Sequence, residues 1–498
     1  MADARSRPIR IVVVGGGIAG LAAAHRLVEL AAAGRVPVEV VLCEARPRLG
    51  GIIATERAGA YLVEAGPDAF LAEKPWGLAL CARLGLTSRL IGTRPALRRT
   101  FVMHAGRLHP LPDGFALMAP ARFGPVARSR LFSWPGKARM AMDLVLPSRP
   151  ARGDESLAQF VTRRLGREVL ERVAQPMIAG IYTADPETLS LAATMPRFLE
   201  LERRYRSVIR GLRHTRADRP GPGAITGQRW TLFVAPADGM EALVTALTAR
   251  LPVSAVRTGT RVAALERADG AGGSAGRYRV LVDRGPALDA DGIIVATEAH
   301  HAGRLLRGLD PELAALLHRI PYASSAAVTV AYRREQVAHP LDGFGFVVPA
   351  AERRPVLACT FSSVKFVGRA PDGHVLLRAF LGGALAPGIL DRDDRALAET
   401  AERDLAAALG ITGAPRLTRV HRHPDAMPQY LIGHLNRVAA IEAHAARHEA
   451  LALAGGAYRG VGIPDCIRSG EVAAERALAA CRLEMDGQGG AGGATRAR

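Results

Sequence analysis

Three glycines near the start of the chain have the spacing that phosphate chemistry requires. Gly15, Gly17 and Gly20 follow an apolar strand predicted over 9–14 and open a helix predicted over 18–33. In this G-x-G-x-x-G pattern the first glycine permits a tight turn, the second lets the backbone approach a pyrophosphate, and the third lets the helix pack against the strand. The amides and partial positive charge at the start of the helix then bind the pyrophosphate. The pattern therefore predicts a phosphate-binding turn.

A carboxylate completes this predicted site. A second strand, predicted over 38–44, ends in Glu44, which lies 24 residues after Gly20. A carboxylate at that distance accepts hydrogen bonds from ribose hydroxyls. Two strands joined by a helix predict a parallel pair, and with the glycines they predict a dinucleotide site. The contacts expected there come from Gly15, Gly16, Gly17, Ile18, Ala19, Gly20, Glu44 and Ala45.

The elements that must position these residues recur along the chain. Helix and strand patterns near 240–300, and a strand, glycine loop and helix over 450–483, have the same character as the N-terminal unit. Between them, 155–219 is helical and strongly charged, and 320–385 has the pattern of antiparallel strands. The predicted fold class is α/β: a Rossmann-like nucleotide domain assembled from separate segments, an inserted α+β domain with an antiparallel sheet, and a helical region.

A second glycine loop distinguishes between dinucleotides. The sequence EARPRLGG directly follows the second strand. A plain NAD domain does not need another double glycine just past the ribose carboxylate, so this loop favours FAD. Together with YLVEAGPDAF (61–70), the loop resembles FAD-dependent amine oxidases and their relatives. The resemblance implies that the cofactor lies along Arg48, Gly50 and Gly51, and that its flavin lies near Gly66, Pro67 and Asp68.

Three longer stretches narrow the resemblance. They are PMIAGIYTADPETLSLAATMPRFLELE (176–202), AMPQYLIGH (426–434) and AGGAYRGVGIPDCIRSGEVAA (454–474). In this order they resemble the oxygen-dependent porphyrinogen oxidases of haem synthesis, over roughly 9–480. The resemblance implies FAD as cofactor, O2 as acceptor, H2O2 as by-product and removal of six electrons in three two-electron steps. Because the hydride passes to flavin N5, no catalytic side chain and no metal are expected.

The last of these stretches has a physical interpretation. The backbone from Gly460 to Ile463 can pass close beneath a flat ring. A helix that begins between Asp465 and Ser469 would direct its positive end toward the N1–C2 carbonyl of the flavin, which favours the anionic reduced form. The cofactor contacts that the resemblance adds are Val262, Val461, Gly462 and Ile463.

The substrate carboxylates require cations, and arginine binds a carboxylate through two parallel hydrogen bonds. Arg98 and Arg99 are the predicted partners. Some family members have a propionate-binding arginine at the position that Thr100 occupies here, so that single anchor is absent. Coproporphyrinogen III carries four propionates and protoporphyrinogen IX two, and the basic segment 94–152 suits four. Phe344 and Phe346 are predicted to line the tetrapyrrole slot, with core packing as the alternative.

The predicted reaction is therefore oxidation of coproporphyrinogen III to coproporphyrin III, with protoporphyrinogen IX oxidation as the alternative. More remote alternatives are an amine-oxidase-like flavoenzyme and a non-catalytic protein that binds porphyrin or flavin. The predicted division of the chain assigns 1–90, 225–300 and 420–484 to the FAD-binding domain. It assigns 91–224 to a basic, largely helical region, 301–419 to a substrate-binding sheet domain, and 485–498 to a disordered tail.

Composition limits the remaining interpretations. The net charge of +19 suggests an anionic partner, but no nucleic-acid recognition motif accompanies it. No window of 18 apolar residues and no cleaved leader are apparent, so we expect a cytoplasmic protein. Segment 115–146 alternates apolar and basic character, which fits either a peripheral surface on the inner face of a membrane or an ordinary domain face. Whether another enzyme of haem synthesis is a partner is left open. The five cysteines are scattered and predict neither zinc nor disulfides.

Overall fold

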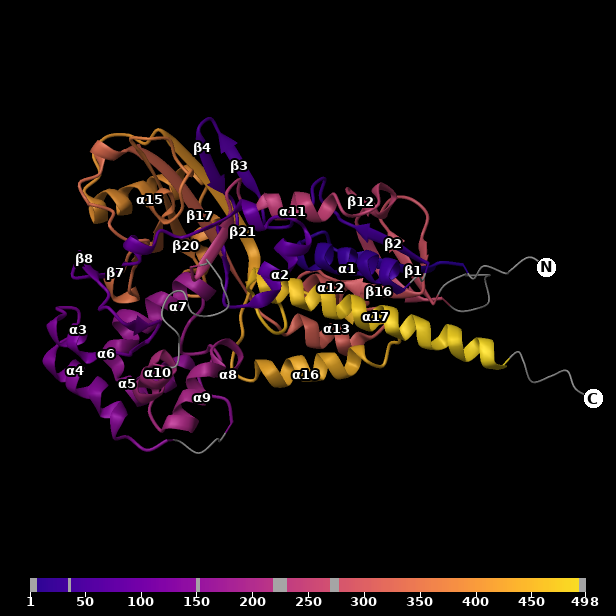
Figure 1. The fold of residues 1–498 in the computed structure, drawn as a ribbon, viewed down its shortest axis with the longest axis horizontal. Helices are drawn as coiled ribbons and strands as arrows, with labels where there is room; N and C mark the ends of the chain where they lie inside the picture. The colour runs from indigo at the N-terminus through magenta and orange to yellow at the C-terminus, as the bar shows by residue number, and fades with distance from the viewer. Residues whose placement is uncertain (1–6, 35–36, 149–152, 218–230, 269–276, 492–498) are drawn as a thin grey trace, which may run out of the picture.

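Five parallel strands form the sheet that carries the first glycine turn. A computed structural model describes residues 7–34, 37–148, 153–217, 231–268 and 277–491 of this mixed α/β protein (Figure 1). The strand order is β12-β2-β1-β16-β22, with all neighbours parallel. The strands are β12 (Val256–Arg257), β2 (Val38–Cys43), β1 (Ile9–Val14), β16 (Gly292–Val295) and β22 (Leu451–Leu453).

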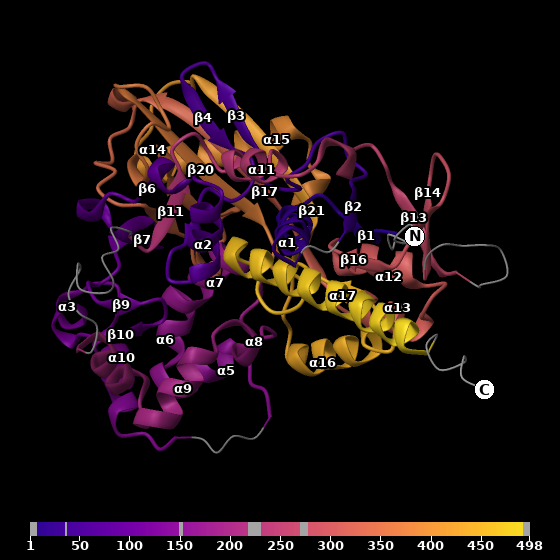
Figure 2. The same cartoon turned by 45° about the vertical axis from the view of Figure 1, so that its right-hand side comes forward.

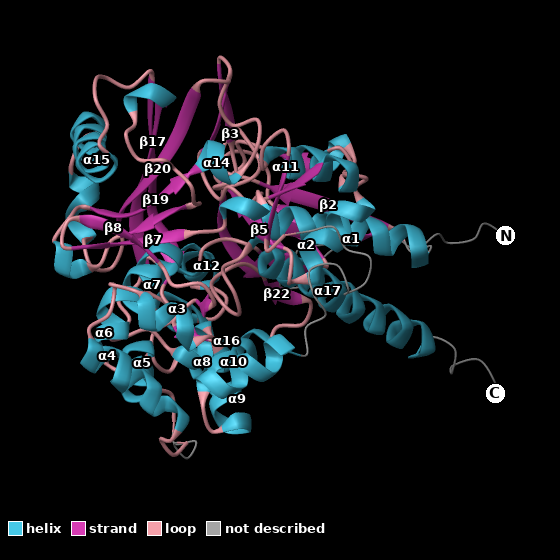
Figure 3. Ribbon diagram, turned by 60° about the vertical axis from the view of Figure 1, so that its left-hand side comes forward, coloured by secondary structure: helices cyan, strands magenta, loops and turns pink. Residues whose placement is uncertain are grey.

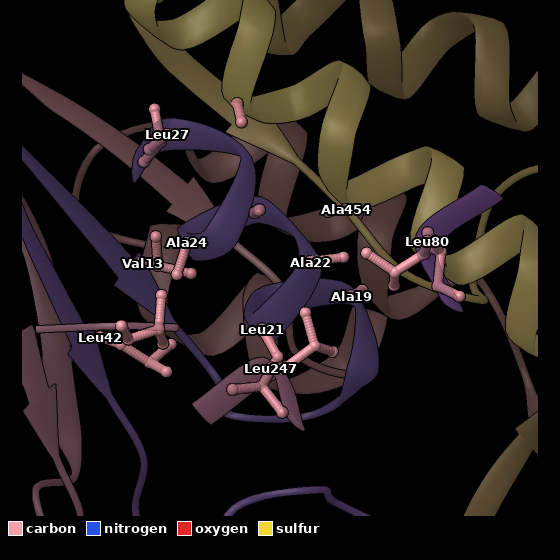
Figure 4. Close-up of a cluster of buried hydrophobic side chains, with 14 of the residues drawn as sticks. Val13, Ala19, Leu21, Ala22, Ala24, Leu27, Leu42, Leu80, Leu247 and Ala454 are labelled. Carbon is pink, nitrogen blue, oxygen red and sulfur yellow. The ribbon is translucent and has the colours of Figure 1, made fainter. Parts of the chain in front are cut away.

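Both faces of this sheet are covered, which is why β1 is apolar at every position but one. Ile11 and Val13 belong to a buried cluster on one face, and Val12 and Val14 to a cluster on the other. Figure 4 shows part of the first cluster, where Leu21 and Leu247 approach one another. The helices on the first face are α1 (Ile18–Gly34), α2 (Pro75–Arg83), α11 (Glu241–Thr248) and α17 (Ile463–Ala491); those on the second are α12 (Ala299–Leu306), α13 (Pro311–His318) and α16 (His434–Ala445).

A second sheet of seven strands lies beside the first and is largely antiparallel (Figure 3). Its order is β21-β17-β20-β19-β18-β7-β8, and only the β18–β7 pair is parallel. Helix α15 (Asp394–Leu409) packs on one face. The strands are β21 (Leu417–Pro428), β17 (Tyr322–Arg333), β20 (His374–Gly382), β19 (Val356–Phe361), β18 (Gly345–Val347), β7 (Thr100–His104) and β8 (Arg107–Pro110).

The predicted division differs from this arrangement in two respects. Strands β7 and β8 come from the region predicted as largely helical, and most of β21 lies beyond the predicted end of the sheet domain at 419. Helices α12 and α13, predicted to belong to the sheet domain, instead pack on the parallel sheet through Leu306 and Leu317. Pairing between strands far apart in sequence produces the first difference, and packing of helices on a distant sheet produces the second; neither leaves a local signal.

Short helices form a third layer with its own buried cluster, below the seven-stranded sheet in Figure 1. The predicted helical stretch 155–219 is broken between 183 and 190, and one turn of it is a π-helix (Leu170–Ala174). The helices are α3 (Phe123–Arg128), α4 (Trp134–Ala141), α5 (Leu157–Leu165), α6 (Arg167–Val169), α7 (Gln175–Tyr182), α8 (Leu191–Thr194), α9 (Pro196–Tyr205) and α10 (Val208–Ala217).

Smaller elements connect the layers. They are the hairpin β3 (Thr55–Ala58) and β4 (Tyr61–Glu64), the strands β5 (Phe70–Leu71), β6 (Leu90–Gly92) and β11 (Phe233–Pro236), and the strand β13 (Val262–Arg267). At the C-terminus α17 continues to Ala491, into the tail predicted from 485 to be disordered, although Gly487, Gly489 and Gly490 have low helix propensity. The predicted border at 224/225 and residues 492–498 lie outside the described residues.

Candidate active site

The first glycine turn has three different environments at its three glycines. Gly15 has φ of +106°, and a Cβ there would lie 2.7 Å from the Ala296 carbonyl oxygen. A Cβ on Gly20 would lie 1.9 Å from the Gly15 carbonyl oxygen, so only glycine permits this close packing. Around Gly17, by contrast, a Cβ would meet no atom within 4 Å. The open position directly precedes α1, where the helix N-terminus offers its amides to an anion.

Glu44 directly follows β2, and its carboxylate is already held by the backbone. One oxygen accepts a hydrogen bond from the Gly16 amide at 2.7 Å and the other from the Arg46 amide at 2.8 Å. A carboxylate has about four lone-pair sites, so each oxygen retains capacity for a ribose hydroxyl. The predicted neighbours are nearby: Ala45 is exposed, and the Thr260 amide donates to the Glu44 carbonyl two residues before Val262, which begins β13.

The second glycine loop lies against the first. Gly50 and Gly51 have φ of +99° and +59°, and a Cβ on Gly51 would lie 3.3 Å from the Gly17 Cα. The Arg48 guanidinium donates to the carbonyls of Gly51 and Ile53 at 2.6 and 3.0 Å, which fixes the loop. Ile52 is 47% exposed. An apolar side chain left exposed between two glycine loops fits a bound cofactor that would cover it.

The third predicted loop, Gly66–Asp68, follows the β3–β4 hairpin. A Cβ on Gly66 would lie 2.0 Å from the Ile52 carbonyl oxygen, so the third loop is packed onto the second. Both carboxylate oxygens of Asp68 lie 3.0 Å from the Lys365 Nζ. Burial alone would raise the pKa of Asp68, but Lys365 and Arg378 outweigh it and the pKa is lowered. Burial raises the pKa of the neighbouring Glu64, which accepts hydrogen bonds from Thr55 and Met240.

The C-terminal motif brings a second helix N-terminus to the same edge of the parallel sheet. Strands β1 and β22 run in the same direction, so α1 and α17 both begin at the carboxyl edge. The two helices are in close contact near their N-termini, because a Cβ on Gly470, the eighth residue of α17, would lie 2.1 Å from the Ala19 carbonyl oxygen. Their proximity is visible in Figures 1 and 2. The predicted residues Val461 and Gly462 directly precede α17 and are half-buried, and Ile463 is its first residue.

Tyr430 fixes the loop that precedes α17. Its hydroxyl donates to the Gly456 carbonyl at 2.6 Å and accepts from the Gly460 amide at 2.8 Å. The ring is 1% exposed and stacks on His434 with centroids 4.0 Å apart. His434 is itself fully buried, and its Nε2 bonds the Tyr458 carbonyl.

One face of the seven-stranded sheet lies toward these loops. Because side chains alternate along a strand, Val347, Ala358 and Phe380 face the helical layer, opposite α7. A Cβ on Gly180 of α7 would lie 3.5 Å from the Ala358 Cβ. Phe380 and Val461 pack at the edge of the same buried cluster. The flavin-side loop, α7 and this sheet face therefore meet at one place.

The predicted substrate residues are distributed differently. Phe346 is 2% exposed and lies on the opposite face of the sheet, on the α15 side, where its ring meets Phe361 edge-on. Phe344 is half-buried, and its amide bonds the Arg99 carbonyl. Arg98 and Arg99 are exposed, and the Arg99 guanidinium pairs with Asp342 at 2.6 Å. An open groove of about 860 Å³ beside α7 has both charge signs, from residues such as Arg167 and Glu171, and so is not the predicted basic pocket.

Two site residues were not predicted, Phe380 and Arg378. Both lie on β20, on the face toward the loops, and the Arg378 guanidinium stacks over the Phe380 ring at 4.9 Å. The alternation in VLLRAFLGG (375–383) places them on one face, because Leu377 and Ala379 lie in the core cluster beneath α15. That period-two pattern was the available signal.

Three features of this edge fit a long anionic dinucleotide with a flat ring: the open position at Gly17, the exposed Ile52 and the two converging helix N-termini. Together they define an FAD-dependent oxidoreductase. The sequence model of flavin-containing amine oxidoreductases matches residues 18–478, so the chain belongs to that family.

Relatives within the family are similar over nearly their whole length. The coproporphyrinogen III oxidase of Bacillus subtilis (strain 168) is 36% identical, covering 94% of this chain and 97% of the relative. The chloroplastic protoporphyrinogen oxidase 1 of Spinacia oleracea is 32% identical, covering 93% and 83%. A crystal structure from Exiguobacterium sp. 255-15, whose proposed activity is protoporphyrinogen oxidation, superposes with a TM-score of 0.81 at 31% identity, covering 94% and 98%.

Proposed function

We propose that this chain oxidises coproporphyrinogen III to coproporphyrin III with O2 as acceptor. One observation carries the proposal: three relatives named coproporphyrinogen III oxidase are 30 to 36% identical over 94% of the chain. The geometry is consistent with it, since all three glycine loops and the α17 N-terminus lie at one edge. When bound, FAD accepts two electrons at a time from the substrate and passes them to O2, so three rounds remove six electrons and release H2O2.

The chain's own contribution is binding and orientation. Phe380, Val347 and Ala358 form the apolar sheet face that a tetrapyrrole ring would contact, with Gly180 opposite. Glycine at 180 leaves room that a larger side chain would fill. Arg98 makes no hydrogen bond or ion pair within the described parts of the chain, so its guanidinium is available to a propionate. Phe380 takes the lining role that the sequence assigned to Phe346.

An aerobic assay of purified, flavin-containing protein tests this function. Coproporphyrinogen III and protoporphyrinogen IX are supplied separately and porphyrin fluorescence is followed. We expect kcat/KM at least about ten-fold higher for the four-carboxylate substrate, which corresponds to one additional charge-assisted hydrogen bond. Arg98→Ala should remove most of that preference, whereas Arg94→Ala, an exposed arginine of the same segment, should retain it. Equal rates, or a preference for protoporphyrinogen IX, would favour the alternative oxidase. If neither substrate yields porphyrin fluorescence, the result would favour the amine-oxidase-like alternative.

A peripheral membrane contact is a second, separate element of the proposal. Trp134, Met142 and Val145 are 74, 45 and 78% exposed on the helical layer, and the Lys137 Nζ lies 4.4 Å from the Trp134 ring centroid. Within the segment 115–146 that the sequence suggested for such a surface, Met118, Leu131 and Phe132 are instead buried in the helical core. No helix within the described ranges is both long and apolar enough to cross a bilayer. An exposed tryptophan beside basic residues suits an anionic lipid surface.

Co-sedimentation with vesicles tests this contact. We expect binding to vesicles that contain anionic lipid, weak binding to purely zwitterionic vesicles, and loss of binding in Trp134→Glu. Val253→Glu serves as the control, because Val253 is 94% exposed on another part of the surface. Equal binding of the wild type and Trp134→Glu would exclude this surface. The cytoplasmic location and a haem-synthesis enzyme as partner stay predictions.

A further inference from the structure

The carbonyl of Ala65, in the segment 64–69, accepts hydrogen bonds from two strands of the seven-stranded sheet. Arg378 Nη2 on β20 donates at 3.1 Å, and His423 Nε2 on β21 lies at 3.0 Å. Because a carbonyl only accepts, the His423 ring must carry its proton on Nε2. Burial and then the charge of Arg378 lower the pKa of His423, which keeps the ring neutral near pH 7.

The rest of the segment is fixed at both ends. The Ala65 amide donates to the Ala54 carbonyl at 2.9 Å, and Asp68 pairs with Lys365. Three backbone amides of the segment have no acceptor within the described part of the chain: those of Gly66, Asp68 and Ala69. The chain has no cis peptide bonds among its described residues, so the Gly66 N–H points away from the carbonyl that Arg378 and His423 hold. Fixing that carbonyl therefore fixes the direction of the amide.

We propose that Arg378 and His423 are positioning residues for the flavin, which hold the 64–69 segment so that its unpaired amides meet the polar edge of the ring. This positioning role rests on the proposed function only because it requires FAD to lie along the three glycine loops. Because Arg378 also stacks on Phe380, the same side chain connects the substrate-facing sheet to the flavin-facing segment. Figure 2 shows the β3–β4 hairpin, which leads into the segment, against β17, β20 and β21.

Substitutions that remove one donor at a time test the proposal. His423→Phe removes a neutral donor without changing charge, and His423→Gln keeps an N–H that can reach the carbonyl. Arg378→Met removes both a donor and a charge. The control is Arg369→Met: this guanidinium is 2% exposed in the same ionic cluster but donates to Pro236 and Ala237 instead. The measurements are FAD dissociation constant, flavin absorption maximum and midpoint potential, all on the holoenzyme without substrate.

We expect His423→Phe to weaken FAD binding about five-fold, to shift the absorption maximum and to lower the midpoint potential, since one hydrogen bond contributes about 1 kcal/mol. His423→Gln should restore wild-type values, and Arg378→Met should show a larger loss than Arg369→Met. Wild-type values in His423→Phe would overturn the proposal, as would equal shifts in Arg369→Met and Arg378→Met. If Arg378→Met does not fold, the comparison of His423→Phe with His423→Gln tests the proposal. Failure of the wild type to oxidise porphyrinogens would refute the proposed function while leaving these flavin measurements possible.

Discussion

Gly17→Glu should give a folded protein that contains no flavin. The substituted side chain meets no atom within 4 Å of its Cβ, and position 17 has no left-handed backbone angle, so the fold accommodates it. An acidic residue at the start of α1 is also favourable for the helix itself. Its carboxylate, however, occupies the space in which the pyrophosphate of FAD would lie. Two like charges in contact cost several kcal/mol, so we expect the FAD dissociation constant to rise by more than about 100-fold.

The measurement is flavin absorbance of the purified protein together with its thermal unfolding profile. Gly308→Glu is the matched control, since Gly308 is also open but lies beyond α12, away from the glycine loops. That variant should retain wild-type flavin content. Gly20→Ala provides the opposite comparison: its Cβ would lie 1.9 Å from the Gly15 carbonyl oxygen, so it should lower stability. Wild-type flavin content in Gly17→Glu would mean that the first glycine turn binds no pyrophosphate.

Asp143→Ala should produce the largest loss of stability outside the cofactor site. Asp143 and Arg164 are both fully buried in the helical layer and form an ion pair at 2.5 Å. The second carboxylate oxygen accepts from the Ser207 hydroxyl at 2.6 Å and from the Ile209 amide at 3.0 Å. Removing the aspartate leaves a buried guanidinium without this partner, which costs about 3–5 kcal/mol in the free energy of unfolding.

Urea unfolding followed by circular dichroism checks this value. Asp283→Ala is the control, because the Arg261–Asp283 pair is solvent-exposed and contributes about 0–1 kcal/mol. The double variant Asp143→Leu with Arg164→Met removes both charges and should recover much of the loss. A change below about 1 kcal/mol in Asp143→Ala would contradict the prediction. Flavin content should change little while the protein stays folded, because the glycine loops belong to other buried clusters.

The geometry of the first glycine turn could be predicted from the sequence because its constraints are local. Gly15 needs a positive φ and Gly20 needs close packing, and both requirements act within a few residues of a strand that is recognisable by itself. Gly66, which is packed against the carbonyl of Ile52, is expected from the family resemblance instead. Such positions accept glycine alone, so the spacing of glycines in the sequence indicates the backbone geometry directly.

The substrate face could not be predicted in the same way. Alternation in β18 and β20 predicts two faces but does not say which one α15 will cover, and so Phe346 rather than Phe380 was expected at the site. The bond from Arg378 to the Ala65 carbonyl joins residues 313 positions apart, a distance at which local patterns carry no information. Likewise, the pairing of β7 with β18 depends on the whole sheet being assembled.

The position of β22 has a consequence for how the protein is made. The cofactor edge needs β1 from the first residues of the chain, but also β22 and the first turns of α17, whose Gly470 packs on Ala19. During synthesis the ribosome releases β22 and α17 more than 400 residues after β1. A growing chain therefore carries an N-terminal glycine turn whose partner helix does not yet exist, and it can retain FAD only after α17 has been synthesised. Flavin uptake would thus report that synthesis has passed Gly470.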